Sequence, residues 1–420
     1  MLGIRNVLKN EYIFSVISRV YLILVGIIVS SFQVRFLGKD LNGRLSYITG
    51  VSAIINMLFL FGFTQSYPYL KKIGDEKFPS LFYGCSILLS LIYLILSVFV
   101  CLFVGVRGEN AVIILTISLS YSVKIAGSLS LIERPTYRNT VQMIVGTVKM
   151  LIMIVLFIAA DSSFFWMVFI FTFGDVLSLI LYSSRLKVKP HIDTKSLARL
   201  VKIMKFGIVP MLGVFLVNLN YRADVYMLKR MMDYSSVSIY STGVGIAEQC
   251  WAIPEAIREI LLYRLTKGKN ADEVCCMLRV SNTATLFFQL GLLVAGRFAI
   301  VLLYGEDYLP SVPILHLAMI SSYGMVFTKL IGAYCITEGK QRIKTFFLLI
   351  AAAVNICFNW CLIPKYGIYG AIYASIISYT LCGLLFIGLF KKIADIHVGD
   401  ILFIRYNDII AICRMIGRKK

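Results

Sequence analysis

Apolar runs of membrane-spanning length dominate this sequence. Twelve runs of mostly apolar residues lie between clusters of charged residues, and each has about the 17 to 25 residues that a helix needs to cross a bilayer. Inside hydrocarbon a chain must satisfy its own backbone hydrogen bonds, which a helix does within one segment. We therefore expect an all-α polytopic membrane protein with twelve transmembrane helices.

The predicted spans divide evenly between the two halves of the chain. In the first half they are 12–34, 44–67, 78–104, 111–132, 139–160 and 164–184. In the second half they are 206–228, 236–257, 281–303, 312–336, 345–363 and 368–390. With 59% hydrophobic and 15% charged residues among 420, the chain has no room for a large soluble domain.

A weak internal repeat supports this division. Tyr47-Ile-Thr-Gly-Val51 is echoed by Tyr240-Ser-Thr-Gly-Val244, each just after the first hydrophobic hairpin of its half. Paired six-helix repeats are a common transporter plan. We predict an N-terminal lobe at 1–184, a basic cytoplasmic linker at 185–205, a C-terminal lobe at 206–390 and a basic cytoplasmic tail at 391–420. An amphipathic run in the tail is expected to lie on the inner membrane surface.

The basic residues indicate topology. The net charge is +20, but the Lys and Arg residues lie between apolar runs and form no single basic motif, which argues against a nucleic-acid partner. With the N-terminus in the cytoplasm, cytoplasmic segments carry more than three times as many Lys and Arg residues as the opposite side. The positive-inside rule then predicts both termini in the cytoplasm.

Several charged residues fall inside the predicted spans. A charge at this depth costs at least a few kcal/mol, so such residues normally face a wet cavity or a partner charge. The cations are Arg19, Lys124, Lys149, Arg297 and Lys329, and the anions are Asp175 and Glu248.

All of these charges except Arg297 lie at a similar predicted depth. At about 1.5 Å per residue they are roughly 10 to 15 Å from the cytoplasmic end of their helices. We expect those that point inward to form a net cationic central cavity, in which Lys124 and Lys149 bind an anionic substrate group. Arg19 and Lys329 can alternatively extend to the membrane interface, and this interpretation is favoured for Arg297.

The carboxylates in the spans admit two interpretations. Asp175 and Glu248 either neutralise neighbouring cations or exchange a coupling proton, because burial makes a carboxyl group titratable near neutral pH. Asp224 is a third candidate for such a role.

Enzyme and metal motifs are missing from the sequence. It has no glycine-rich phosphate loop, no paired-cysteine motif and no histidine-rich site. The ten cysteines are expected to be free thiols. We predict a transporter and not an enzyme, without a cofactor or a bound metal.

Four motifs occur in order along the chain. They are Arg35-Phe-Leu-Gly38 with Gly43 and Tyr47, Arg222-Ala-Asp224 with Tyr240, Tyr304-Gly-Glu-Asp-Tyr308, and Leu362-Ile-Pro-Lys-Tyr-Gly367. Together they resemble polysaccharide flippases of the Wzx type, in the multidrug/oligosaccharidyl-lipid/polysaccharide (MOP) superfamily.

The resemblance implies a fold and a function. It implies two six-helix lobes around a central cavity, as in MATE-like transporters, in a bacterial inner membrane. It also implies transfer of undecaprenyl-pyrophosphate-linked oligosaccharide, such as an O-antigen unit of lipopolysaccharide, from the inner to the outer leaflet. A polysaccharide polymerase and chain-length machinery are the partners that it implies.

Two other functions remain as alternatives. A multidrug or cation antiporter of the same superfamily would favour anionic cavity residues, whereas the predicted cavity is net positive. A membrane glycan polymerase or ligase would typically carry a large outer loop, whereas every predicted outer loop is short.

Overall fold

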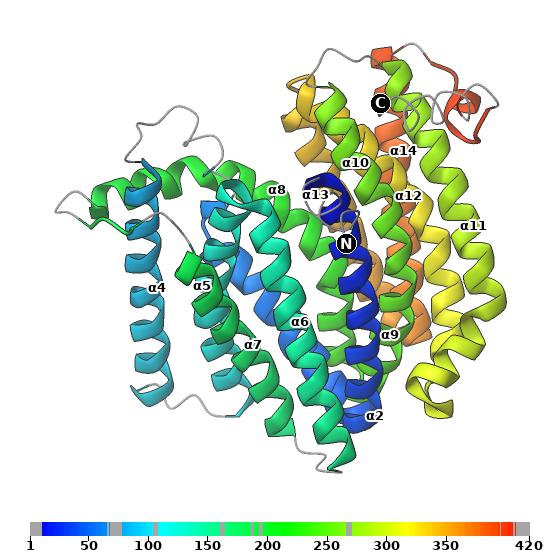
Figure 1. The fold of residues 1–420 in the computed structure, drawn as a ribbon. Coiled ribbons are helices and arrows are strands. Elements are labelled where there is room, and N and C mark those ends of the chain that lie inside the picture. The colour runs from blue at the N-terminus through cyan, green and yellow to red at the C-terminus, as the bar shows by residue number, and fades with distance from the viewer. Residues whose placement is uncertain are drawn as a thin grey trace, which may run out of the picture. The chain divides into compact units, whose positions relative to one another are not determined.

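The chain forms an all-α structure in a computed structural model (Figure 1). The structure describes residues 11–64, 67, 78–103, 108–159, 164–185, 189–192, 196–265, 271–394, 396–405 and 408. Twelve α-helices and three short 3-10 helices account for most of this part, and it contains no strand. Residues 1–10, 71–77 and half of the predicted tail at 391–420 lie outside the described residues.

The helices belong to two compact units, Met1–Phe215 (unit 1) and Leu216–Lys420 (unit 2). Their boundary lies within α8 (Ser196–Met231). The seventh predicted span began at Phe206, so α8 starts inside the predicted linker and the linker is partly helical. The helix begins before the predicted span because Arg199, Lys202 and Lys205 interrupt the apolar run without interrupting the helix.

Unit 1 contains the first six predicted spans. They are α2 (Glu11–Phe59), α4 (Phe78–Phe103), α5 (Glu109–Glu133), α6 (Pro135–Ile158) and α7 (Phe164–Arg185), of which α2 holds two spans. Gly38 divides α2, with φ of 67° and ψ of −176°. Helix α2 packs against α5 and α6, and α5 also packs against α4 and α7 (Figure 1).

The N-terminal part of α8 completes the core of unit 1. Leu200 and Ile203 are buried against aromatic residues that follow α2 and begin α4. Gly207 comes so close to the turn at Gly62 that a Cβ on either glycine would overlap the other backbone. Gly207 is therefore a packing position.

Unit 2 contains the remaining spans. They are α9 (Tyr234–Ala247), η1 (Glu248–Trp251), α10 (Ala252–Leu265), α11 (Ala271–Tyr304), α12 (Ser311–Thr337), α13 (Gln341–Tyr366) and α14 (Ile368–Ala394). The eighth predicted span is therefore broken into two α-helices. Pro254 has no N–H to donate to the Cys250 carbonyl, which accounts for a break at this point.

Helix α12 is the centre of unit 2. It packs against α9, α10, α11 and α14, and 72% of its most hydrophobic window is buried. Gly324 of α12 meets Gly383 of α14 so closely that added Cβ atoms would collide with the opposing backbone. Such small residues allow membrane helices to approach each other closely.

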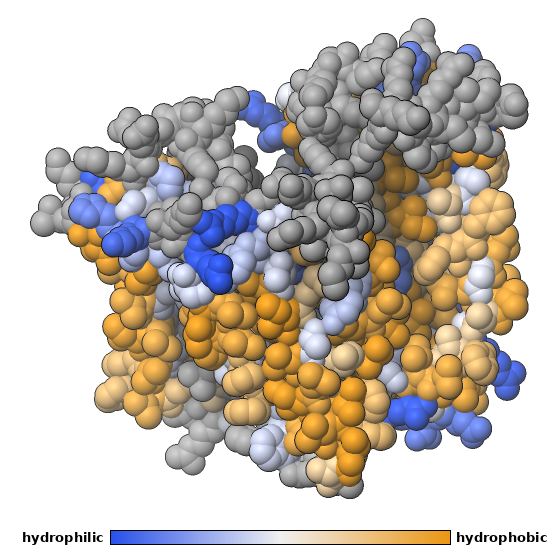
Figure 2. All heavy atoms as spheres, viewed as in Figure 1, coloured by the Kyte–Doolittle hydropathy of each residue, from blue (hydrophilic) through white to orange (hydrophobic). Residues whose placement is uncertain are grey.

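The outward faces of both units are apolar. Leu102 and Phe103 on α4 and Phe287 and Val294 on α11 are mostly exposed. On the face in Figure 2, hydrophobic residues cover the middle of the helices and hydrophilic ones gather toward the ends. Eight described helices have the length and composition to cross a membrane. The outer faces thus suit a hydrocarbon solvent.

Turns that were predicted to share one side of the membrane meet within each unit. In unit 1, the His191 amide donates to the Ser80 carbonyl, and the Tyr137 hydroxyl bonds the Leu181 carbonyl. In unit 2, Ser238 Oγ lies 2.9 Å from the Tyr308 hydroxyl oxygen. These contacts agree with an up-and-down order of the spans.

The described part of the predicted tail packs against α11. The Arg279 guanidinium forms two hydrogen bonds with the Asp408 carboxylate, at 2.6 and 2.5 Å. These hydrogen bonds lower the pKa of Asp408 to about 2. Ile401, in η3 (Val398–Ile401), is fully buried in the unit 2 core. This contact joins the start of the predicted amphipathic run to the unit 2 core.

Candidate functional site

A cavity of about 190 Å³ in unit 1 contains two of the predicted charges. We call it the lysine cavity; Asn56 of α2, Ser120 and Lys124 of α5, and Phe171 and Asp175 of α7 are among its lining residues. Ser120 and Lys124 share a helix face because they are four residues apart, and so do Phe171 and Asp175. The Ser120 hydroxyl donates to Asp175 Oδ2 at 3.0 Å.

Lys149 of α6 lies against the same helix, α7. Its ammonium nitrogen lies 5.2 Å from the centre of the Phe171 ring. Its side chain crosses Gly174 so closely that a Cβ there would overlap Lys149 Cε. Two lysines thus lie near one carboxylate, Lys124 in the cavity lining and Lys149 beside it.

Unit 2 contains a second group of charges. Lys329 of α12 donates to Glu255 Oε2 at 2.8 Å, and Arg258 Nε donates to Glu255 Oε1 at 2.9 Å. Arg222 of α8 lies 3.5 Å from Glu248 Oε2. These pairs link α8, η1, α10 and α12. The broken eighth span supplies both carboxylates: Glu248 is the first residue of η1, and Glu255 lies in the first turn of α10.

Aromatic side chains lie beside these ion pairs. Trp251 packs against Tyr221 and Tyr379, with ring centres 4.9 and 5.9 Å away. The Lys329 ammonium lies 5.8 Å from the centre of the Trp251 ring. An aromatic ring next to a cation gives a surface that attracts cations and packs against apolar faces.

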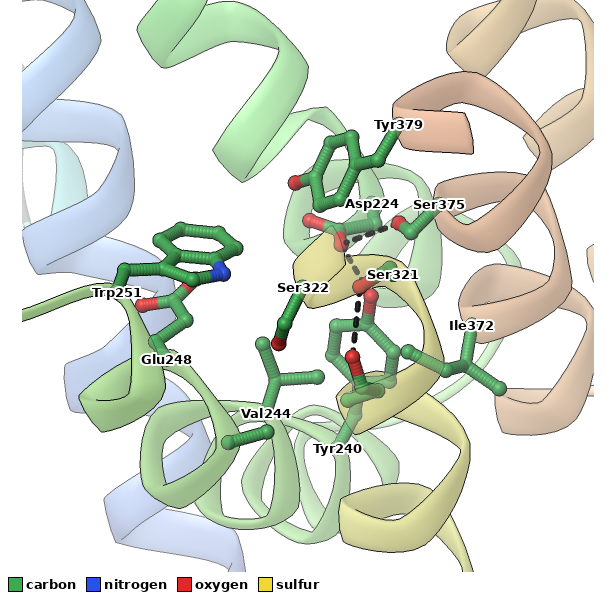
Figure 3. A pocket seen from close by; sticks show the side chains of 12 residues that line it. Asp224, Tyr240, Val244, Glu248, Trp251, Ser321, Ser322, Ile372, Ser375 and Tyr379 are labelled. Atoms are coloured by element: carbon green, nitrogen blue, oxygen red, sulfur yellow. Dashed lines mark hydrogen bonds between the residues drawn. The ribbon is translucent and has the colours of Figure 1, made fainter. Parts of the chain in front are cut away.

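Asp224 is the centre of a buried polar network (Figure 3). Its carboxylate accepts hydrogen bonds from the Val225 amide at 2.8 Å, from the Tyr240 hydroxyl and from Ser375 Oγ at 3.4 Å. Asn355 Nδ2 lies 3.4 Å from Ser375 Oγ. Because Asp224 is 2% exposed, these hydrogen bonds compensate for removing its charge from water.

A small cavity adjoins both Asp224 and Glu248. Trp251, Ser322 and Tyr379 also line it, and Figure 3 shows their side chains around it. Among the described residues, Glu248 Oε1, Trp251 Nε1 and Ser322 Oγ are buried without a hydrogen-bond partner. These atoms include an acceptor, a donor and a group that can be either. Buried polar atoms of this kind call for a bound water or another small ligand.

The structure brings together only some of the predicted site residues. Lys124, Lys149 and Asp175 form one group in unit 1, while Glu248, Lys329 and Asp224 contribute to neighbouring groups in unit 2. Arg19 is half-buried on α2, outside the lining of the lysine cavity. Arg297 is exposed on α11.

Two residues of the unit 2 group were missed by sequence reasoning. Arg222 was counted with an outer loop, but it lies well inside α8. Glu255 was assigned no role. Both residues lie inside predicted spans, and a charged residue in a span is the sequence signal that could have identified them. The described residues contain no group of three or more His, Cys, Asp and Glu residues placed to hold a metal ion.

Comparisons with known proteins identify the fold. A lipid II flippase, MurJ, in an inward closed conformation matches with a TM-score of 0.72 at 15% identity, over 97% of this chain and 93% of the other. An inward-facing multidrug resistance MATE family transporter of the MOP superfamily matches with a TM-score of 0.65 at 9% identity, over 88% and 94% of the two chains.

An outward-facing structure of such a MATE transporter is similar as well, with a TM-score of 0.62 at 9% identity over 92% and 96% of the chains. No protein-family model and no curated protein matches the sequence. The predicted fold class is confirmed: this is an all-α polytopic membrane protein with the MATE-like fold of MOP superfamily transporters.

Proposed function

We propose that this protein is a flippase that moves undecaprenyl-pyrophosphate-linked oligosaccharide units from the inner to the outer leaflet by alternating access. The fold is one that a lipid II flippase and MATE transporters share. The four Wzx-type motifs favour a lipid-linked glycan, of which an O-antigen unit is one example. The proposed location is a bacterial inner membrane with both termini in the cytoplasm, as the distribution of Lys and Arg favours.

The observation that carries the proposal is the lysine cavity. Lys124 lines this cavity together with Asp175, and Lys149 lies beside it against Phe171 and Gly174, so an approaching anion meets two lysines near one carboxylate. A diphosphate cannot cross hydrocarbon without a replacement for its hydration shell, and ammonium groups supply one. The polyprenyl chain can meanwhile remain in an apolar environment. Asn56 and Ser120 at the cavity offer hydrogen bonds to sugar hydroxyl groups.

The cation-antiporter alternative is favoured by a different observation. Unit 2 holds Asp224, Glu248 and Glu255, and an aromatic surface lies beside Glu248. These carboxylates could receive a cationic drug. We favour the flippase because Glu255 is paired with two cations and Asp224 is already bonded within its network, whereas the two lysines lie near one carboxylate.

The test is complementation of a strain that lacks its own flippase, with the surface polysaccharide of the parent organism co-expressed. The native chain is expected to deliver lipid-linked units to the outer leaflet. Replacing Lys124 and Lys149 together by Gln should lower delivery roughly 10- to 100-fold, the effect of losing charge-assisted phosphate contacts. The measurement is enzymatic labelling of units that are accessible from outside.

Arg297→Gln is the matched control, because it removes a cation from an exposed position within a span. It should leave delivery within about twofold of the native value. Unchanged delivery by the double Lys124/Lys149 variant would refute the role of the lysine cavity. Failure of the well-inserted native chain to deliver any units would favour the antiporter.

A further inference from the structure

A second cavity in unit 1, of about 500 Å³, lies between α4, α5 and α7. We call it the serine groove; its lining includes Ser86, Ser90 and Leu94 of α4, Leu119 and Ser122 of α5, and Leu179 of α7. Its size falls in the range of about 300 to 1,000 Å³ that is common for small-ligand pockets. None of the predicted charges lines it.

The serines of α4 have small side chains that leave the groove wide, and their hydroxyl groups add little polarity to it. Ser86 Oγ donates to the Tyr83 carbonyl at 2.8 Å, and Ser90 Oγ donates to the Ser86 carbonyl at 2.8 Å. Both hydroxyl groups are thus satisfied by their own helix. Their small side chains leave space beside Leu94 and Leu179. A ligand that fills this space needs apolar surface and few hydrogen-bonding groups.

The serine groove adjoins the lysine cavity. Leu119 lines both spaces. On α7, Asp175 lines the lysine cavity, while Leu179 and Ser183 line the groove. These three residues follow each other at intervals of four, so they form one stripe on the helix. A single molecule with a charged head and an apolar chain could therefore occupy both spaces.

The groove also borders the surface that faces lipid. Leu91 and Leu94, which line it, are 50% and 48% exposed, and Ile95 and Phe99 further along α4 are 66% and 51% exposed. Apolar exposure of this extent on a membrane helix marks contact with hydrocarbon. A hydrophobic chain could thus reach the groove from the bilayer without crossing water.

We propose that the serine groove binds the polyprenyl chain of the lipid carrier while its pyrophosphate contacts Lys124 and Lys149. This inference rests on the proposed function, because it takes the lysine cavity as the site of the headgroup. The groove would then select lipid-linked substrates, since a free sugar phosphate gains nothing from it. It would also fix the distance between the headgroup and the hydrocarbon.

The test compares two probes on the full-length protein in lipid nanodiscs. Inorganic pyrophosphate carries the charge alone, and undecaprenyl pyrophosphate carries the charge and the chain. Ser90→Phe fills the groove with a ring at a half-buried position whose hydroxyl bonds only its own helix. It should weaken binding of undecaprenyl pyrophosphate at least about tenfold and leave pyrophosphate binding within about twofold.

Ile95→Phe is the control, because it adds a similar ring to the lipid-exposed face of the same helix outside the groove lining. It should bind both probes like the native chain. Native binding of undecaprenyl pyrophosphate by a folded Ser90→Phe variant would overturn the inference. Photo-crosslinking with a benzophenone-tagged polyprenyl pyrophosphate should label α4 or α5 peptides near the groove, whereas label found only on peptides away from the groove would also overturn the inference.

The proposed function fails in a different way. If Lys124→Gln binds inorganic pyrophosphate as tightly as the native protein, the headgroup site is elsewhere, whatever Ser90→Phe does. If Lys124→Gln weakens both probes and Ser90→Phe weakens neither, the headgroup site stands and the groove is excluded as the chain site.

Discussion

At the scale of single residues, we expect Asp224 and Glu248 to couple transport to an ion gradient. Asp224 is held by three hydrogen bonds, and Glu248 faces the same small cavity with an oxygen that has no hydrogen-bond partner among the described residues. Carboxylate oxygens of this kind can bind a proton or a hard cation such as sodium. We expect the Asp224→Asn and Glu248→Gln variants to insert normally into the membrane. Their transport rate should no longer increase when an ion gradient is imposed.

The measurement is initial transport in proteoliposomes with an imposed proton or sodium gradient, compared with no gradient. Tyr240→Phe serves as the control, because it removes one donor to Asp224 and keeps the carboxylate. It should retain the response to the gradient. Full gradient dependence in both carboxyl variants would show that neither residue carries the coupling ion.

At the scale of the helix, Gly38 determines how the first two spans are joined. Its φ of 67° and ψ of −176° lie in a region that is almost restricted to glycine. Gly38→Ala should lower the free energy of unfolding by about 1 to 3 kcal/mol, although a Cβ there would meet no atom within 4 Å. The cost is therefore backbone strain and not a clash. Thermal unfolding of the purified protein measures it.

Gly26→Ala in the same helix separates strain from a general effect of alanine. Gly26 also has open space around a Cβ, but its φ is not in the positive region. Alanine at an ordinary helical position should stabilise by up to about 1 kcal/mol. Equal unfolding temperatures for the two variants would contradict the argument for Gly38.

At the scale of the whole molecule, the expected orientation follows from the basic residues between spans. Glu306 precedes α12 and Glu338 follows it, and both side chains are exposed. We expect Glu338→Cys to face the cytoplasm and Glu306→Cys to face the outside. Labelling of intact cells with a membrane-impermeant maleimide should modify only Glu306→Cys, above the background of the parent chain.

Labelling after permeabilisation is the control and should modify both variants. The reverse pattern in intact cells would place the termini outside. The flippase would then have to take up its substrate from the opposite side of the membrane. Labelling of both in intact cells would indicate that Ser311–Thr337 does not cross the membrane.

The candidate site shows how far local sequence information reaches. Lys124, Lys149 and Asp175 could be proposed because a charge inside an apolar run is costly wherever the helix points. That they lie near one another depends on how far each helix is rotated about its own axis. The partners of Lys329 and Arg222 were not predicted either, because Glu255 and Glu248 come from a different span. Rotation and packing of whole helices decide these pairs.

The sequence alone determined the all-α membrane fold, the approximate spans and their order, because these depend on the transfer of each segment from water to hydrocarbon. Only the tertiary structure decided where α8 passes from one compact unit to the other, where the eighth span breaks, and which charges share a cavity. Those features depend on contacts between residues far apart in the chain. Span composition cannot specify them, since many helix rotations bury the same amount of apolar surface in lipid.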